Sequence, residues 1–236
     1  MCGLNGIFAY AATAPAPSPD EVRRVRDAMT VRGPDGEGLW SSADRRCVLG
    51  HRRLSILDLS DRALQPMTTD DARYTIVYNG EVYNYPELRD EAVKLGRQLH
   101  TTSDTEVLLD LYAREGAAMV ERLRGMFAFA IWDAAERSLF LARDPFGMKP
   151  LFFADDGRTI RFASQVRALR QGGGISREVD PAGVVGFALL GSVPEPFTWF
   201  RDVQALPAGH CMMVSAEGAS APVRYFDPAA TLAELA

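Results

Sequence analysis

A cysteine at position 2 opens the sequence, within the stretch MCGLNGIF. A small residue at this position allows an aminopeptidase to remove Met1, which would leave Cys2 with a free α-amino group. Because the pKa of an α-amine is about 8, a useful fraction is unprotonated near neutral pH and can take the thiol proton directly or through water. Nucleophile and base would then be one residue. If Met1 is retained, Cys2 has no such amine.

Other polar residues stand at positions where chemistry could use them. Asn79-Gly80 lies in YNGEVYN, and this dipeptide predicts a tight hairpin turn between a strand and its return. Taken alone, Arg53 in HRRLSI suits a solvated strand residue. Asp104 in TSDTEV suits the first turn of a helix, where the helix dipole favours a carboxylate. The elements that position these residues therefore have to be considered.

The composition is that of an ordinary globular protein. The 236 residues are 47% hydrophobic, which is ample for a buried core. The net charge of -5 argues against nucleic acid as a partner, and the apolar runs are too short to span a bilayer. The N-terminus has no basic patch followed by a long apolar run, so we expect no secretory signal. Three scattered cysteines, Cys2, Cys47 and Cys211, favour a reducing compartment over disulfides or structural zinc, so we expect a cytoplasmic protein.

The first half of the sequence predicts strands and covering helices. A strand over Leu4–Tyr10 is followed by an amphipathic helix that begins at Pro19. Strand-like runs follow at Cys47–Leu49 and Leu54–Leu57. Two helices are predicted in PELRDEAVKLG and SDTEVLLDLYAREG, and Ser103 opens the second with capping-box spacing.

Short strands dominate the second half, in MFAFAIWD, SLFLARD, PLFFADDG and TIRFAS. The first of these is apolar on both faces, which predicts a strand inside a layered structure. A helix is predicted in DPAGVVGFALLG, and the last strands near GHCMMVS and RYFD. Together these elements predict one α+β domain of two packed antiparallel sheets flanked by helices.

Seven motifs occur in order along the chain: MCGLNGIF, RGPDGEG, HRRLSILD, YNGEVYN, TSDTEV, GMFAFAIWD and ARDPFGMKPLF. Together they resemble the class II glutamine amidotransferases, whose glutaminase domain belongs to the N-terminal nucleophile hydrolases. The stretch GSVPEPFTWFRDVQALPAGHCMMV, followed by RYFD, is similar to the asparagine synthetase branch of that class. The resemblance implies a four-layer αββα sandwich of two mostly antiparallel sheets flanked by helices.

The resemblance implies that Cys2 attacks the side-chain amide of glutamine. A γ-glutamyl thioester forms and ammonia leaves before water regenerates the thiol. Asn79 and Gly80 match the oxyanion-hole pair, through the Asn amide and the Gly backbone N–H, and preorganised donors suit that task. A hairpin turn at Asn79-Gly80 is compatible with this role, because the turn would aim these donors.

Substrate recognition is also implied by the resemblance. Arg53 matches the residue that pairs with the α-carboxylate of glutamine, which suits a planar bidentate donor. Asp104 matches the residue that binds the α-ammonium. Glu81 matches a further polar contact to the substrate.

The remaining matching residues are interpreted as scaffold. They fall in the RGPD turn and in the ARDPFGMKP motif, as Arg32, Gly33, Pro34, Asp35, Arg143, Asp144, Gly147 and Lys149. The mechanism needs none of the histidines as a base, namely His51, His100 and His210. The sequence departs from the family pattern at Thr30, Val31 and Gln165, and we expect no thiol chemistry at these positions.

A second, ATP-dependent domain with a SGGxDS-type loop completes a synthetase of this branch, and no such loop occurs in this sequence. We therefore expect ATP and Mg²⁺ only in that absent domain, with no cofactor and no metal for the glutaminase half. Residues 1–227 are predicted to be the glutaminase domain, and 228–236 a C-terminal tail or the start of a linker.

The leading hypothesis is hydrolysis of glutamine to glutamate and ammonia. The expected partners are glutamine and an asparagine synthetase-type domain or subunit that accepts the ammonia, with a homodimer left open. Two alternatives also stay open: a different acceptor, such as a sugar or a natural product, and a non-catalytic regulatory domain of a synthetase. The intact set of site residues argues against the regulatory domain, whereas retention of Met1 would favour it.

Overall fold

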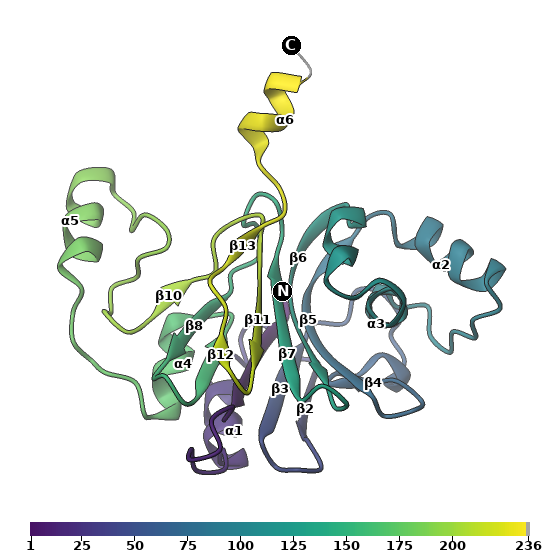
Figure 1. The fold of residues 1–236 in the computed structure, drawn as a ribbon, viewed down its shortest axis with the longest axis horizontal. Helices are drawn as coiled ribbons and strands as arrows, with labels where there is room; N and C mark the ends of the chain where they lie inside the picture. Colours follow the sequence, from purple (N-terminus) through teal and green to yellow (C-terminus); the bar gives the residue numbers. More distant parts are fainter. Residues whose placement is uncertain (235–236) are drawn as a thin grey trace.

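Two antiparallel β-sheets pack face to face in the computed structural model, which describes residues 1–234 (Figure 1). Sheet A contains, in spatial order, β10 (Gln204–Ala205), β8 (Phe152–Asp155), β9 (Ile160–Ala163), β1 (Gly3–Phe8), β3 (Cys47–Arg53) and β2 (Gly36–Ser41). Sheet B contains β12 (Gly218–Ala219), β11 (His210–Ser215), β7 (Ser138–Arg143), β6 (Gly125–Asp133), β5 (Tyr74–Val82) and β4 (Met67–Thr68), with β13 (Val223–Arg224) paired to β11.

Helices cover the outer face of each sheet. On sheet A lie α1 (Pro19–Asp27) and α4 (Val166–Gly172), where Val22 of α1 packs on Ile7 and Val48. On sheet B lie α2 (Tyr85–Lys94) and α3 (Asp104–Glu115), on the right of Figure 1, with the short 3-10 helices η1 (Asp61–Ala63) and η2 (Gly116–Arg122) nearby. The predicted αββα layering is therefore confirmed.

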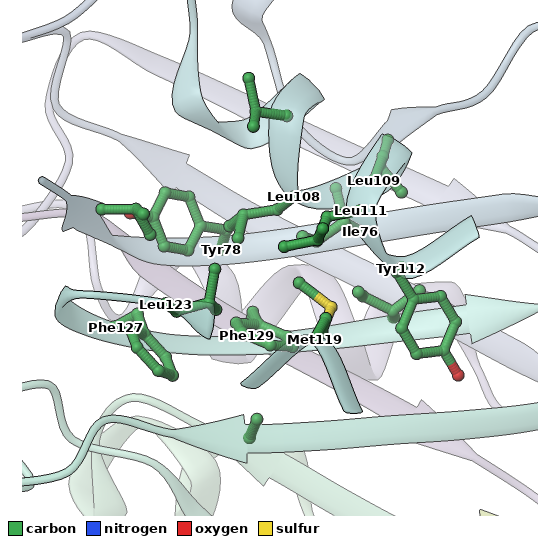
Figure 2. Close-up of a cluster of buried hydrophobic side chains, with 14 of the residues drawn as sticks. Ile76, Tyr78, Leu108, Leu109, Leu111, Tyr112, Met119, Leu123, Phe127 and Phe129 are labelled. Atoms are coloured by element: carbon green, nitrogen blue, oxygen red, sulfur yellow. The ribbon is translucent and has the colours of Figure 1, made fainter. Parts of the chain in front are cut away.

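Strand β6 is buried on both faces, as its sequence predicts. Its odd-numbered residues from 127 to 131, among them Phe129, belong to the core between sheet B and α3, which Figure 2 shows in close-up. Its even-numbered residues from 128 to 132, among them Trp132, belong to the core between the two sheets. Trp132 meets Phe8 of sheet A edge to face, with ring centroids 5.0 Å apart. The same strand thus joins both cores and fixes the distance between the sheets.

The predicted hairpin turn at Asn79-Gly80 is wrong. Strand β5 runs straight through both residues and pairs with β6, Asn79 opposite Ala128 and Gly80 opposite Phe127. The glycine is needed for close approach, because a Cβ at Gly80 would lie 2.4 Å from the carbonyl oxygen of Met126. The chain turns later, just before α2.

The strand-like run Leu54–Leu57 is also not a strand. Strand β3 ends at Arg53, and the residues after it form a loop. The buried guanidinium of Arg53 donates hydrogen bonds to the carbonyls of Asp58 and Ser60, so the loop folds over the end of β3 instead of pairing with a neighbour.

Two helices lie outside the layers: α5 (Pro181–Leu190), at the left of Figure 1, and α6 (Pro228–Glu234), which leads to the C-terminus. The predicted tail at 228–236 thus begins with a helix, and its last two residues lie outside the described part of the chain; the boundary itself stays a prediction. Within residues 1–234, no helix has both the length and the apolar character needed to cross a membrane.

Candidate active site

One pocket contains all six predicted site residues, namely Cys2, Arg53, Asn79, Gly80, Glu81 and Asp104. They come from four segments: the residue before β1, the end of β3, the end of β5 and the first turn of α3. The pocket encloses about 630 Å³, including its open mouth. The two sheets and α3 therefore bring together residues that lie as many as 102 positions apart in the sequence, from Cys2 to Asp104.

The thiol of Cys2 is held at the pocket wall. The backbone N–H of Leu54 donates to Sγ at 3.4 Å, and Arg32 Nε donates to the Cys2 carbonyl at 2.9 Å. Burial raises the pKa of the Cys2 thiol, although the Leu54 N–H, the chain's terminal ammonium and the Arg53 guanidinium oppose this rise. Near neutral pH the thiol is therefore protonated and needs a base before it can act as a nucleophile.

The side-chain amide of Asn79 is buried without a partner for its nitrogen. Only 1% of Asn79 is exposed, and Nδ2 donates no hydrogen bond to any described residue. A buried donor of this kind costs free energy unless a ligand or water accepts from it. This nitrogen is thus available to an oxygen atom bound in the pocket.

The backbone N–H of Gly80 lies on the open edge of β5. Alternate N–H groups of a strand point to the same side. The Tyr78 N–H donates to Gln65 Oε1 at 2.6 Å, and the Val82 N–H donates to Asp104 Oδ2 at 3.1 Å, both away from β6. Gly80 lies between these residues, so its N–H points to the same edge, which lines the pocket.

Arg53 contributes a buried positive charge. Its guanidinium donates to the Ser60 carbonyl at 2.9 Å and to the Asp58 carbonyl, and it forms no ion pair within the described residues. Neutral carbonyls leave the charge uncompensated. A ligand carboxylate would therefore find a planar donor whose charge is still unpaired.

Asp104 contributes the opposite charge at the start of α3. Its Oδ2 accepts hydrogen bonds from the Tyr78 hydroxyl at 2.7 Å and from the Val82 N–H at 3.1 Å. Burial raises the pKa of Asp104, and these hydrogen bonds oppose the rise. No described Arg, Lys or His forms an ion pair with this carboxylate, so it can accept a ligand cation.

Glu81 also lines the pocket and is half-buried. Its negative charge contributes to the raised pKa of Asp104. No side-chain hydrogen bond fixes its carboxylate among the described residues, and its contact with substrate stays a prediction.

The two motifs interpreted as scaffold surround this pocket. Asp35 accepts a hydrogen bond from the Ser55 N–H at 2.8 Å and so anchors the loop after β3. Arg143 donates to the carbonyls of Gly147 and Lys149, both at 2.8 Å. The carboxylate of Asp144 accepts from four backbone N–H groups, those of Phe127, Phe146, Met148 and Lys149.

Lys149 does more than its interpretation as scaffold implies, because its side chain reaches the pocket wall. Its Nζ lies 3.6 Å from Sδ of Met1, and only 6% of the residue is exposed. Removal of Met1 would therefore leave this ammonium facing the space beside Cys2.

The histidines occupy positions that fit structural or surface roles. His51 is buried on β3, and its Nε2–H donates to the Tyr78 carbonyl at 2.9 Å. Burial lowers its pKa to about 4, so this ring is neutral near pH 7. His210 bonds to the Ala208 carbonyl, and exposed His100 lies 3.2 Å from Asp70. None of the three lines the pocket.

The departures from the family pattern lie outside the pocket. Val31 is 97% exposed just after α1, and Gln165 directly precedes α4. Both line a separate surface hollow beside Arg32 and Phe152. The Thr30 hydroxyl donates a hydrogen bond to the Asp27 carbonyl at the end of α1.

Among the pocket residues that sequence reasoning missed are Tyr78 and Gln65. Tyr78 directly precedes Asn79 in an apolar strand, where alternation indicates only a core residue. Gln65 lies in a loop, and its two hydrogen bonds, to the Tyr78 N–H and to Thr105 Oγ1, connect segments far apart in sequence. No local pattern signals either contact.

The comparisons with known proteins agree with this geometry. A putative glutamine-hydrolyzing asparagine synthetase of Mycobacterium tuberculosis is 39% identical over 97% of this chain. Glutamine-hydrolyzing asparagine synthetase 1 of Bacillus subtilis is 36% identical over 92% of it. The chain spans only 37% and 34% of the lengths of these two relatives.

A solved structure shows the same fold. It is the glutamine phosphoribosylpyrophosphate amidotransferase of B. subtilis in complex with ADP and GMP, with a TM-score of 0.69 over 95% of this chain and 49% of that one. The identity is 20%, so the likeness concerns the fold alone, and it confirms the predicted architecture of two packed antiparallel sheets flanked by helices. A family model described as a glutamine amidotransferase domain matches residues 1–226. With that match and identities above 35% to the two relatives, the chain belongs to the glutamine amidotransferase domain family.

Proposed function

We propose that the domain hydrolyses glutamine to glutamate and ammonia through a γ-glutamyl thioester on Cys2. One observation carries the proposal: the thiol, an unpartnered amide donor and two unpaired opposite charges line the same pocket. Free glutamine offers a carboxamide, an α-carboxylate and an α-ammonium. Asn79 and Cys2 suit the carboxamide, Arg53 suits the α-carboxylate, and Asp104 suits the α-ammonium.

The first half of the proposed reaction acylates the enzyme. After loss of Met1, the α-amine of Cys2 takes the thiol proton, and Sγ forms a bond to the carboxamide carbon. The oxyanion accepts hydrogen bonds from the Asn79 amide and the Gly80 N–H. The carbon–nitrogen bond then breaks, and the α-ammonium of Cys2 returns the proton to the nitrogen, which leaves as ammonia.

The second half restores the thiol. Water gives a proton to the α-amine of Cys2 and attacks the thioester carbonyl, where the same two donors stabilise the oxyanion. The carbon–sulfur bond breaks, glutamate leaves, and the proton passes from the amine to the sulfur. The α-amine of Cys2 thus accepts and returns the proton in both halves of the reaction. We propose that the glutaminase domain needs no cofactor.

Ammonia release from glutamine by the purified protein tests this proposal. We expect release by the wild type and by Cys211→Ala, which removes a half-buried thiol on β11 outside the pocket. Cys2→Ala is expected to release none while it still binds glutamine. Equal release by the wild type and Cys2→Ala would contradict the proposed nucleophile.

We further propose that the ammonia passes to an asparagine synthetase-type, ATP-dependent domain or subunit in the cytoplasm. The names of the relatives and their greater length support this part. ATP and Mg²⁺ would serve only that partner. Glutamine-dependent amidation of aspartate after mixing with such a subunit tests the acceptor, and transfer to another acceptor would contradict it. The homodimer stays a prediction that the mass in solution can test.

A further inference from the structure

Tyr78 connects three segments of the protein at the pocket. Its hydroxyl donates to Asp104 of α3, its N–H donates to Gln65 before β4, and its carbonyl accepts from His51 of β3. These distances are 2.7, 2.6 and 2.9 Å, and only 3% of Tyr78 is exposed. The backbone of Tyr78 is thus held by residues of both sheets, and its hydroxyl is held by Asp104.

This hydroxyl acts on the orientation of Asp104. It shares Oδ2 with the Val82 N–H, so two donors from β5 hold the same carboxylate oxygen. Two donors on one oxygen restrict the rotation of the Asp104 carboxylate. The donors on β5 and the acceptor on α3 come from different elements, so this contact also fixes the start of α3 against sheet B.

Two other tyrosines of the same core make no contact of this kind. Tyr74 lies on the same strand and the same face of β5, and Tyr112 lies on α3 (Figure 2 shows Tyr78 and Tyr112 at opposite ends of the cluster). Neither hydroxyl makes a hydrogen bond within residues 1–234, whereas their rings meet edge to face at 5.4 Å. Among these three tyrosines, Tyr78 is thus the one whose hydroxyl bonds to a charged residue of the pocket.

We propose that Tyr78 is a positioning residue, whose hydroxyl holds the Asp104 carboxylate in the orientation that binds the α-ammonium of glutamine. This inference rests on the proposed function and deepens it. Discrimination between glutamine and a carboxamide without the α-amino group then depends on Tyr78. The monoamide of glutaric acid is that second compound, since it keeps the carboxamide and the distal carboxylate.

The test compares kcat/KM for the two compounds in the wild type, Tyr78→Phe and the matched control Tyr74→Phe. In Tyr78→Phe we expect the preference for glutamine to fall about tenfold, the lower end for a lost hydrogen bond to a charged group. Hydrolysis of the monoamide should stay as in the wild type, and Tyr74→Phe should keep the wild-type preference. An unchanged preference in Tyr78→Phe, or equal losses on both compounds, would overturn the inference.

Binding separates this inference from the proposed function. Calorimetric titration of Cys2→Ala with both compounds, with and without Tyr78→Phe, gives the same preference without turnover. A wild type that releases no ammonia would contradict the proposed function alone. An unchanged binding preference on addition of Tyr78→Phe would contradict the role of Tyr78 alone.

Discussion

The two sides of the pocket differ in how their polar groups are satisfied. On the thiol side, the Asn79 amide nitrogen has no partner within residues 1–234, and Gly80, whose N–H lies on the open edge of β5, lines the same pocket. On the side of α3, Asp104 accepts two hydrogen bonds through one oxygen. In the proposed reaction, the donors for an oxyanion that exists only transiently are left free, whereas the carboxylate for a permanently charged ligand is held in place. We propose that adjacent residues of one strand, Tyr78 and Asn79, serve these two tasks.

The largest expected effect comes from the base on the thiol side. A glutamate inserted between Met1 and Cys2 should block removal of Met1 and leave the thiol without a free α-amine. Because burial raises the pKa of that thiol, ammonia release should fall about 10²–10⁴-fold although the cysteine is still present. Intact mass confirms that Met1 is retained. Activity within twofold of the wild type would show that the base is another group.

Asn79→Ala removes the unpartnered donor. We expect kcat to fall about 10²–10³-fold with little change in KM, because the lost hydrogen bond forms only with the oxyanion. Steady-state kinetics measures both values, and thermal unfolding checks the fold of the variant. A rise in KM at constant kcat would instead show that Asn79 binds the substrate in its ground state. The proposed difference between the Asn79 and Asp104 sides of the pocket would then be wrong.

Asp104→Asn tests the opposite side. The amide keeps the shape but loses the charge that faces the α-ammonium, so KM should rise about 10–100-fold with a smaller change in kcat. Glu87→Gln, on the exposed side of α2, is a matched control that should keep the wild-type KM. A loss confined to kcat would place Asp104 in the chemical steps.

The smallest expected effect is a pH shift. Asp104 must be ionised to bind an ammonium, so binding of glutamine is lost as the pH falls through its pKa. Its neighbours are the Tyr78 hydroxyl, the Val82 and Thr105 N–H groups, and the Glu81 carboxylate. Tyr78→Phe removes a hydrogen bond that lowers the pKa, so the acidic limb of kcat/KM should move to higher pH. If the acidic limb does not move, a group other than the Asp104 carboxylate causes the loss of kcat/KM at low pH.

The sequence predicts more of the layers than of the contacts within the pocket. The apolar residues on both faces of β6 predict its place between two cores, because the polarity of each face of a strand follows from whether that face is buried. Asn79-Gly80 gives a wrong prediction of a turn. The glycine is required by the close approach of the Met126 backbone, which no local sequence pattern indicates. Tyr78 is missed for a related reason: its strand position indicates packing, while its hydroxyl meets a helix that begins 26 residues later.

Intact mass after treatment with an irreversible glutamine analogue tests the central claim most directly. The account predicts a protein that lacks Met1 and gains one adduct, with no adduct in Cys2→Ala and an unchanged adduct in Cys211→Ala. A protein that lacks Met1 yet gains no adduct and releases no ammonia, or one that gains its adduct in Cys2→Ala as well, would contradict it.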